Sequence, residues 1–155
     1  MNSESRPIVF LLCGLPGSGK TTYAKELEKI GVIRLSLDEE LFKLFGRQFS
    51  PDQYTELEAK TKRYLLEQLD VCLNDHKSVV LDWGFWRKDE REEIKTFVSN
   101  KGGKAKLVYF KRSLDVFAKG IENRNLYDNH KITIEMLKKF VTQFEEPRGE
   151  NEEIM

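Results

Sequence analysis

A glycine-rich segment, residues 14–21, contains the residue types that bind a nucleoside triphosphate. It reads Gly-Leu-Pro-Gly-Ser-Gly-Lys-Thr and matches the pattern G-x-x-x-x-G-K-[ST] at every fixed position. The glycines of this pattern let the backbone curl so that its N–H groups point at a polyphosphate. Lys20 can reach the β- and γ-phosphates, and the Thr21 hydroxyl can bind the Mg²⁺ that bridges them. This segment, the phosphate loop, therefore predicts a site for ATP and Mg²⁺.

The phosphate loop lies between two elements that should position it. Residues 8–13 form an apolar run rich in β-branched and aromatic side chains, which is typical of a strand buried on both faces of a parallel sheet. A helical pattern starts at Gly19, so the positive end of a helix should face the phosphates. We expect the nucleotide to contact Gly14, Pro16, Gly17, Ser18, Gly19, Lys20, Thr21 and Thr22.

Two acidic residues each follow a further apolar run. Asp82 ends one run, at the strand edge where ligands of open α/β sheets bind, and we expect it to hold Mg²⁺ or a Mg²⁺-bound water beside Thr21. An aspartate there could instead cap a turn. Asp38 follows another run, where a carboxylate could accept the proton of a hydroxyl that receives the γ-phosphoryl group. The alternative is that Asp38, Glu39 and Glu40 only form the acidic first turn of a helix.

An aromatic cluster, Trp83, Phe85 and Trp86, follows Asp82 directly. A turn at this place should be polar, so these rings must be covered by something apolar. We expect two of the three to pack beneath the helix that begins near Lys88. The remaining one, Trp83 or Trp86, should face the acceptor pocket.

Strand and helix patterns alternate along the chain, as expected for βαβ units of an α/β fold. Ser50, Pro51 and Gln53 have the spacing of a capping box at the start of a long helix. Beyond residues 8–13, the predicted strands are 32–35, 79–81 and 105–110. The predicted helices after the first are 51–74, 88–100, 113–123 and one beginning at Thr133.

Length and charge limit the classes of function. The chain has 155 residues, so we predict a single domain, residues 1–155, with flexible ends at 1–6 and 148–155. Lys plus Arg and Asp plus Glu both total 26, which argues against a nucleic-acid partner.

Cys13 and Cys72 have no metal-type spacing and are predicted free thiols. No segment approaches the ~20 apolar residues of a membrane span, so we expect a cytoplasmic protein without a membrane partner. We also expect a monomer or weak dimer.

The order of the motifs GLPGSGKTT, RLSLDE and VVLDWGFW resembles the small P-loop kinase group, which includes polynucleotide kinases, chloramphenicol phosphotransferase and zeta toxins. Within it the chain looks most like the AAA_33 ATP-binding family, over residues 7–147. The resemblance implies a three-layer P-loop NTPase sandwich with a parallel sheet of strand order 2-3-1-4 and a short lid. It also implies phosphate and Mg²⁺ binding by Lys20 and Thr21, catalysis by Asp38, and Arg124 over ATP.

Three functions stay open from the sequence. The first is transfer of the γ-phosphoryl group of ATP to a hydroxyl of a small molecule. The second is a polynucleotide 5′-hydroxyl kinase; such enzymes have an arginine shortly after the acid, whereas here none follows Asp38 before Arg47. The third is a nucleotide-binding regulator or slow NTPase with no acceptor. We assign Arg112 and Lys119 to solvated surface and leave the polar segment 124–131 as the candidate lid.

Overall fold

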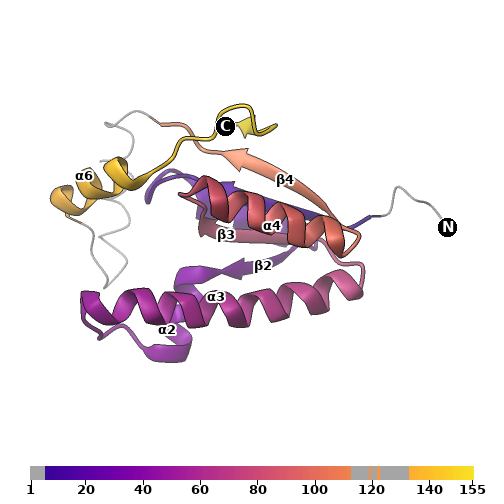
Figure 1. Cartoon of the computed structure of the whole chain (residues 1–155), viewed down its shortest axis with the longest axis horizontal. Helices are drawn as coiled ribbons and strands as arrows, with labels where there is room; N and C mark the ends of the chain where they lie inside the picture. The colour runs from indigo at the N-terminus through magenta and orange to yellow at the C-terminus, as the bar shows by residue number, and fades with distance from the viewer. Residues whose placement is uncertain (1–5, 113–118, 120–121, 123–132) are drawn as a thin grey trace.

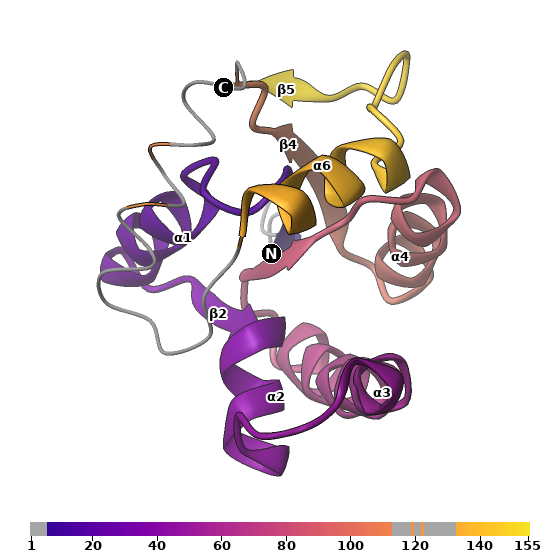
Figure 2. The ribbon, with the colours of Figure 1, turned by 90° about the vertical axis from the view of Figure 1, so that its left-hand side faces the viewer.

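The computed structural model describes residues 6–112 and 133–155, together with residues 119 and 122. Within them a parallel sheet has the strand order β2-β3-β1-β4-β5, with helices on both faces (Figures 1 and 2). The predicted order 2-3-1-4 is confirmed and gains a short fifth strand beside β4. The strands are β1 Ile8–Cys13, β2 Ile33–Ser36, β3 Val79–Gly84, β4 Lys104–Tyr109 and β5 Glu153–Ile154.

The described helices agree closely with the sequence patterns. They are α1 Lys20–Lys29, α2 Leu37–Phe45, α3 Pro51–Asn74, α4 Lys88–Asn100 and α6 Ile134–Gln143. The start of α3 is fixed by the Ser50 N–H, which donates to Gln53 Oε1 at 2.9 Å, as the capping-box spacing predicts. The start of α6 is fixed by Thr133 Oγ1, which accepts from the Met136 N–H at 3.1 Å. The helix predicted over 113–123 and the lid predicted over 124–131 lie outside the described residues, apart from residues 119 and 122.

The core has two parts because both faces of the sheet are covered. Leu11 of β1 packs on one face with side chains of α3 and α4, such as Leu69 and Val98. Leu12 points to the opposite face, against Ala24 of α1. Alternate side chains of a strand point to opposite faces, so burial on both sides requires an unbroken apolar run. This packing holds the carboxyl end of β1, and with it the phosphate loop, at a fixed place.

The end of the chain differs from the flexible segment that we predicted after Pro147. The Glu150 side chain is buried and forms an ion pair with Arg91 of α4, which is fully buried. Three residues later the chain forms β5, which pairs with β4. A polar, acidic sequence suggested a solvated tail, but the partner that allows Glu150 to be buried lies 59 residues away. The packed end extends the sheet on the β4 side.

Cys13 and Cys72 are free thiols, as predicted. Burial raises the pKa of the Cys13 thiol to about 12, although Arg91 and Lys20 oppose the rise. An uncharged, buried thiol of this kind is a packing residue. Among the described residues, no helix has the length and apolar character that crossing a membrane requires.

Candidate active site

The backbone of the phosphate loop has the shape that an anion requires. Gly17 and Gly19 have φ angles of +79° and +102°, in the region that favours glycine. A Cβ on Gly14 would lie 2.8 Å from Ser18 Oγ and 3.2 Å from Phe110 Cβ, so any other residue there would have to displace these neighbours. Gly19 is the N-cap of α1 and supplies no side-chain hydrogen bond. Because Gly19 has no side chain to cap the helix, a phosphate can take the place of a cap and accept from the N–H groups at the start of α1.

The Lys20 side chain curls back over the phosphate loop. Its Nζ donates to the Leu15 carbonyl oxygen at 2.9 Å and lies 3.5 Å from Ser18 Oγ. These contacts keep the ammonium group at the loop. A cation at this place fits the predicted contact with the β- and γ-phosphates.

Thr21 and Asp82 meet at the carboxyl edge of the sheet, although 61 residues separate them in the sequence. Thr21 Oγ1 donates to Asp82 Oδ2 at 3.0 Å, and Asp82 is only 9% exposed. A hydroxyl and a carboxylate are oxygen ligands of the kind that Mg²⁺ prefers. The described residues contain no cluster of three or more His, Cys, Asp or Glu that could hold a metal by themselves. A Mg²⁺ ion here would therefore need oxygens from the nucleotide and from water, which is usual for this ion.

Asp38 lies in the first turn of α2 and is exposed. Ser36, two residues earlier, pairs in register with Asp82, so the helix starts beside the Thr21–Asp82 contact. The N-cap is Ser36, whose Oγ accepts from the Glu39 N–H at 3.3 Å. Asp38 thus belongs to an acidic first turn, but it does not cap the helix. The structure leaves its predicted role as proton acceptor a prediction.

In the aromatic cluster two rings are buried and the third contacts the phosphate loop, while a ring facing an acceptor pocket stays a prediction. Trp83 and Phe85 are buried and stack with ring centres 5.4 Å apart. Trp86 is half-buried, and its Nε1 donates to the Gly14 carbonyl oxygen at 3.2 Å. On its other side the Trp86 ring packs against Phe140 of α6, with ring centres 4.8 Å apart. Trp86 therefore lies between the phosphate loop and α6 and holds the loop at Gly14.

Two arginines near the phosphate loop were missed from the sequence. Arg34 of β2 has a side chain only 7% exposed, and its Nη2 lies 3.4 Å from Asp82 Oδ2. Burial opposes its charge, but hydrogen bonds to Glu39 and Asp82 outweigh burial and raise its pKa. Arg112, which we assigned to solvated surface, has its Nη2 3.8 Å from where a Cβ on Gly19 would lie. A charged residue inside an otherwise apolar strand was the one available signal for Arg34.

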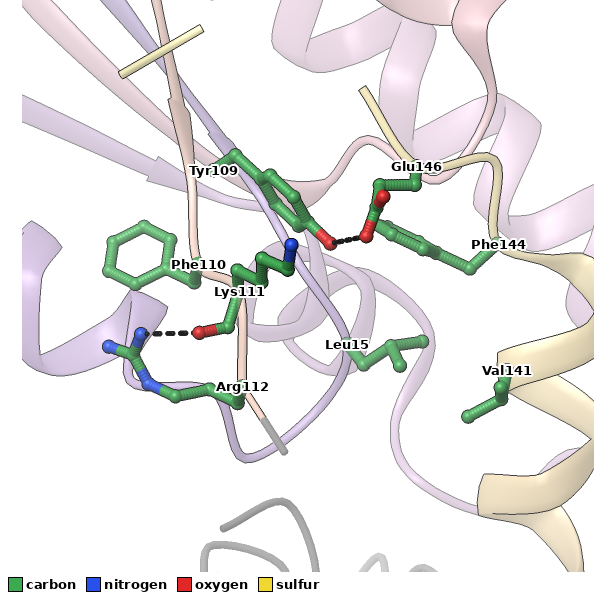
Figure 3. Close-up of a pocket in the computed structure, with 8 residues that line it drawn as sticks. All are labelled: Leu15, Tyr109, Phe110, Lys111, Arg112, Val141, Phe144 and Glu146. Atoms are coloured by element: carbon green, nitrogen blue, oxygen red, sulfur yellow. Dashed lines mark hydrogen bonds between the residues drawn. The ribbon is translucent and has the colours of Figure 1, made fainter. Parts of the chain in front are cut away.

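A pocket of about 210 Å³ borders the phosphate loop on the β4 side (Figure 3). The Tyr109 hydroxyl donates to Glu146 Oε2 at 2.6 Å along its wall. Burial and this bond raise the pKa of Tyr109, and the same bond lowers the pKa of Glu146. The pocket is lined by Leu15, Tyr109, Phe110, Lys111, Arg112, Val141, Phe144 and Glu146. Of the predicted catalytic and Mg²⁺-binding residues that the structure describes, none lines this pocket, which therefore adjoins the candidate site.

The sheet order and the phosphate loop between β1 and α1 together define a P-loop NTPase fold of the α/β class. The sequence matches the AAA_33 family, an AAA domain, over residues 9–147, and the chain belongs to that family. Arg124, which the resemblance placed over ATP, lies outside the described residues.

Solved structures share this fold. A chain of the Pnkp1/Rnl/Hen1 RNA repair complex superposes with a TM-score of 0.75 at 18% identity, over 89% of this chain and 44% of that one. Kti12 from Chaetomium thermophilum, solved with ADP-AlF3, superposes with a TM-score of 0.69 at 17% identity, over 95% of this chain and 88% of that one. The APS kinase CysC of Mycobacterium tuberculosis, solved with AMPPNP and APS, superposes with a TM-score of 0.65 at 18% identity, over 97% of this chain and 88% of that one. This chain spans less than half of the chain from the RNA repair complex.

Proposed function

We propose that the chain is an ATP- and Mg²⁺-dependent kinase that transfers the γ-phosphoryl group to a hydroxyl of a small molecule. The observation that carries this proposal is the Thr21–Asp82 hydrogen bond of 3.0 Å beside a glycine-rich phosphate loop. It brings the two predicted Mg²⁺ ligands together at the place where the triphosphate would lie. The similar structures solved with ADP-AlF3 and with AMPPNP support an adenine nucleotide as the ligand.

In this proposal each residue has one task. The phosphate-loop N–H groups and Lys20 hold the β- and γ-phosphates, and Thr21 and Asp82 hold Mg²⁺, which neutralises charge on those oxygens. The acceptor oxygen bonds to the γ-phosphorus while the bond to the β–γ bridging oxygen breaks, and ADP leaves. Asp38 takes the proton of the acceptor hydroxyl. Arg124 is carried over from the resemblance as a lid residue over the transferred group.

The position of Asp38 favours an acceptor over a second nucleotide contact. Asp38 lies in the first turn of α2, which follows β2, whereas the phosphate loop follows β1. Because β3 lies between these two strands, Asp38 is one strand further from the phosphate loop than Asp82 is. Of the adjoining acidic residues, Glu39 is paired with Arg34, whereas Glu40 adds negative charge beside Asp38. A polyanionic nucleic acid would be repelled there, whereas an uncharged or cationic small molecule would not.

The proposal is tested by incubating the purified chain with γ-labelled ATP, Mg²⁺ and a small-molecule extract of cells. A separate reaction contains a 5′-hydroxyl oligonucleotide, and Lys20→Ala serves as the matched inactive control. Label on a small molecule supports the proposal, whereas label on the oligonucleotide would replace it with a polynucleotide kinase. Label only in free phosphate would indicate an NTPase or regulator without an acceptor.

A further inference from the structure

Arg34 places a buried guanidinium group directly beside Asp82. In the register of β2 and β3, Arg34 pairs with Val80, and Ser36 pairs with Asp82. Since alternate residues share a face, Arg34 and Asp82 lie on the face of the sheet that α1 covers, next to Thr21. A buried charge needs partners, and Arg34 has two carboxylates: Glu39 at 2.7 Å from Nη1 and Asp82 at 3.4 Å from Nη2.

The contact between Arg34 and Asp82 uses only half of the guanidinium edge. Nη2 and Nε share one edge of the arginine fork, and this edge can donate two parallel hydrogen bonds to a carboxylate. Arg34 Nη2 makes a long contact to Asp82, and the buried Nε has no hydrogen-bond partner in the described structure. If this pair only stabilised the fold, both Nη2 and Nε would be expected to donate to the carboxylate.

Elsewhere in the chain, an arginine and a glutamate form both of these hydrogen bonds. Arg91 donates from Nε and Nη2 to the two carboxylate oxygens of Glu150, at 2.8 and 3.0 Å. Asp82 is turned differently, because Thr21 and Arg34 both donate to its Oδ2. Within the part of the chain that the structure describes, Asp82 Oδ1 accepts no hydrogen bond. One carboxylate oxygen is thus held in place while the other is left for a ligand.

We infer that Arg34 is a positioning residue of the Mg²⁺–nucleotide site. It holds Asp82 Oδ2 toward Thr21, which leaves Asp82 Oδ1 for Mg²⁺ or its water, and its unpartnered Nε–H is a donor for an oxygen at the same place. Through Glu39 it also ties this carboxylate to α2, the helix that contains Asp38. This inference rests on the proposed function, because it assigns Arg34 a task at the proposed Mg²⁺ site.

The inference predicts a change in Mg²⁺ dependence rather than in phosphate binding. Calorimetry measures the affinity of the full chain for ADP, at varied Mg²⁺ concentrations and in EDTA. Removing a residue that orients a metal ligand typically costs about 10–100-fold in metal affinity. Arg34→Met should therefore raise the Mg²⁺ concentration for half-maximal enhancement of ADP affinity by about 10–100-fold. ADP affinity in EDTA should change less than about threefold, because the phosphate loop is intact.

Two further variants keep the test decisive. Arg34→Lys retains the charge but lacks the two-donor edge, so it should also raise the Mg²⁺ requirement, even if Arg34→Met fails to fold. Arg63→Met, an exposed arginine of α3, should behave as wild type. Wild-type Mg²⁺ dependence in a folded Arg34→Met or Arg34→Lys protein would overturn the inference, even if the melting temperature falls. If the wild-type chain itself shows no Mg²⁺-dependent ADP binding, the proposed function fails first, and the role of Arg34 with it.

Discussion

Trp86 Nε1 donates a hydrogen bond to the Gly14 carbonyl oxygen at 3.2 Å, which connects the segment after β3 to the first residue of the phosphate loop. The other tryptophan of the chain, Trp83, donates instead to the Leu35 carbonyl oxygen at 3.2 Å and is buried. One indole therefore contacts the proposed nucleotide site, and the other lies in the core.

This difference predicts which tryptophan reports nucleotide binding. Adding ADP with Mg²⁺ should change the intrinsic fluorescence of Trp83→Phe about as much as that of the wild-type chain. Trp86→Phe should lose most of the change, because the remaining indole does not contact the phosphate loop. A full response in Trp86→Phe and none in Trp83→Phe would contradict the placement of the nucleotide.

The proposed proton acceptor is tested by Asp38→Asn. This change keeps the size of the side chain but removes the base, so it should slow phosphoryl transfer by about 10²–10⁴-fold and leave ATP affinity within about threefold. Glu40→Gln makes the same charge change in the same helical turn and should have little effect on the transfer rate. Because Ser36 and not Asp38 caps α2, loss of a helix cap would not explain a slower transfer rate, and a melting curve shows that the variant is folded. Transfer at the wild-type rate in Asp38→Asn would remove Asp38 from the chemistry.

The proposed Mg²⁺ ligands are tested together. Asp82→Asn and Thr21→Val each remove one of the two groups that meet at 3.0 Å. Each should raise the Mg²⁺ concentration for half-maximal transfer, by about 10–100-fold. Thr21→Ser retains the hydroxyl and should stay near the wild-type value. An unchanged Mg²⁺ curve in both disruptive variants would show that other groups hold the metal.

Breaking the buried Arg91–Glu150 pair should destabilise the fold strongly. Glu150→Gln would leave the buried Arg91 charge without its partner and should cost about 3–5 kcal/mol of unfolding free energy. Glu153→Gln breaks only an exposed pair with Lys106 and should cost less than about 1 kcal/mol. Chemical denaturation of the two variants measures this difference. Equal losses would mean that the packed chain end contributes little.

The same pair predicts a dependence of stability on pH. Hydrogen bonds from Arg91 lower the pKa of Glu150 from its ordinary 4.5, although desolvation opposes them. A carboxylate with a lowered pKa stabilises the fold fully above its unfolded pKa, and this contribution is lost as pH falls through the folded pKa. The advantage of the wild-type chain over Glu150→Gln should therefore be constant near neutral pH and shrink below about pH 4.5. A constant advantage down to pH 3 would contradict the assigned ion pair.

Local signals in the sequence were sufficient to predict most of the helices and strands and the phosphate loop. The capping residues Ser50 and Thr133 marked the starts of α3 and α6, and the glycine-rich pattern marked the phosphate loop. These signals depend on neighbouring residues, so they can be recognised without a structure. The Thr21–Asp82 contact was also expected, because parallel strands place their carboxyl ends at one edge.

The missed features depend on pairs that are far apart in the sequence. Arg34 appeared to be one polar residue within a strand until the register of β2 and β3 placed it beside Asp82. Glu150 appeared to belong to a solvated acidic end until its partner Arg91 was found inside α4. Burial of a charge is stable only with a partner, and the sequence alone does not show which distant residue that partner is.

The central claim, that the phosphate loop holds a nucleotide whose γ-phosphoryl group is transferred, is tested most directly by Lys20→Ala. Lys20→Ala loses the 2.9 Å hydrogen bond from Nζ to the Leu15 carbonyl oxygen, so a melting curve first shows that the variant is folded. The measurement is the rate at which label from γ-labelled ATP reaches the identified acceptor. We predict a decrease of at least about 10²-fold, together with weaker ATP binding, because a positive charge facing the phosphates is lost. Transfer at the wild-type rate by a folded Lys20→Ala protein would contradict the account.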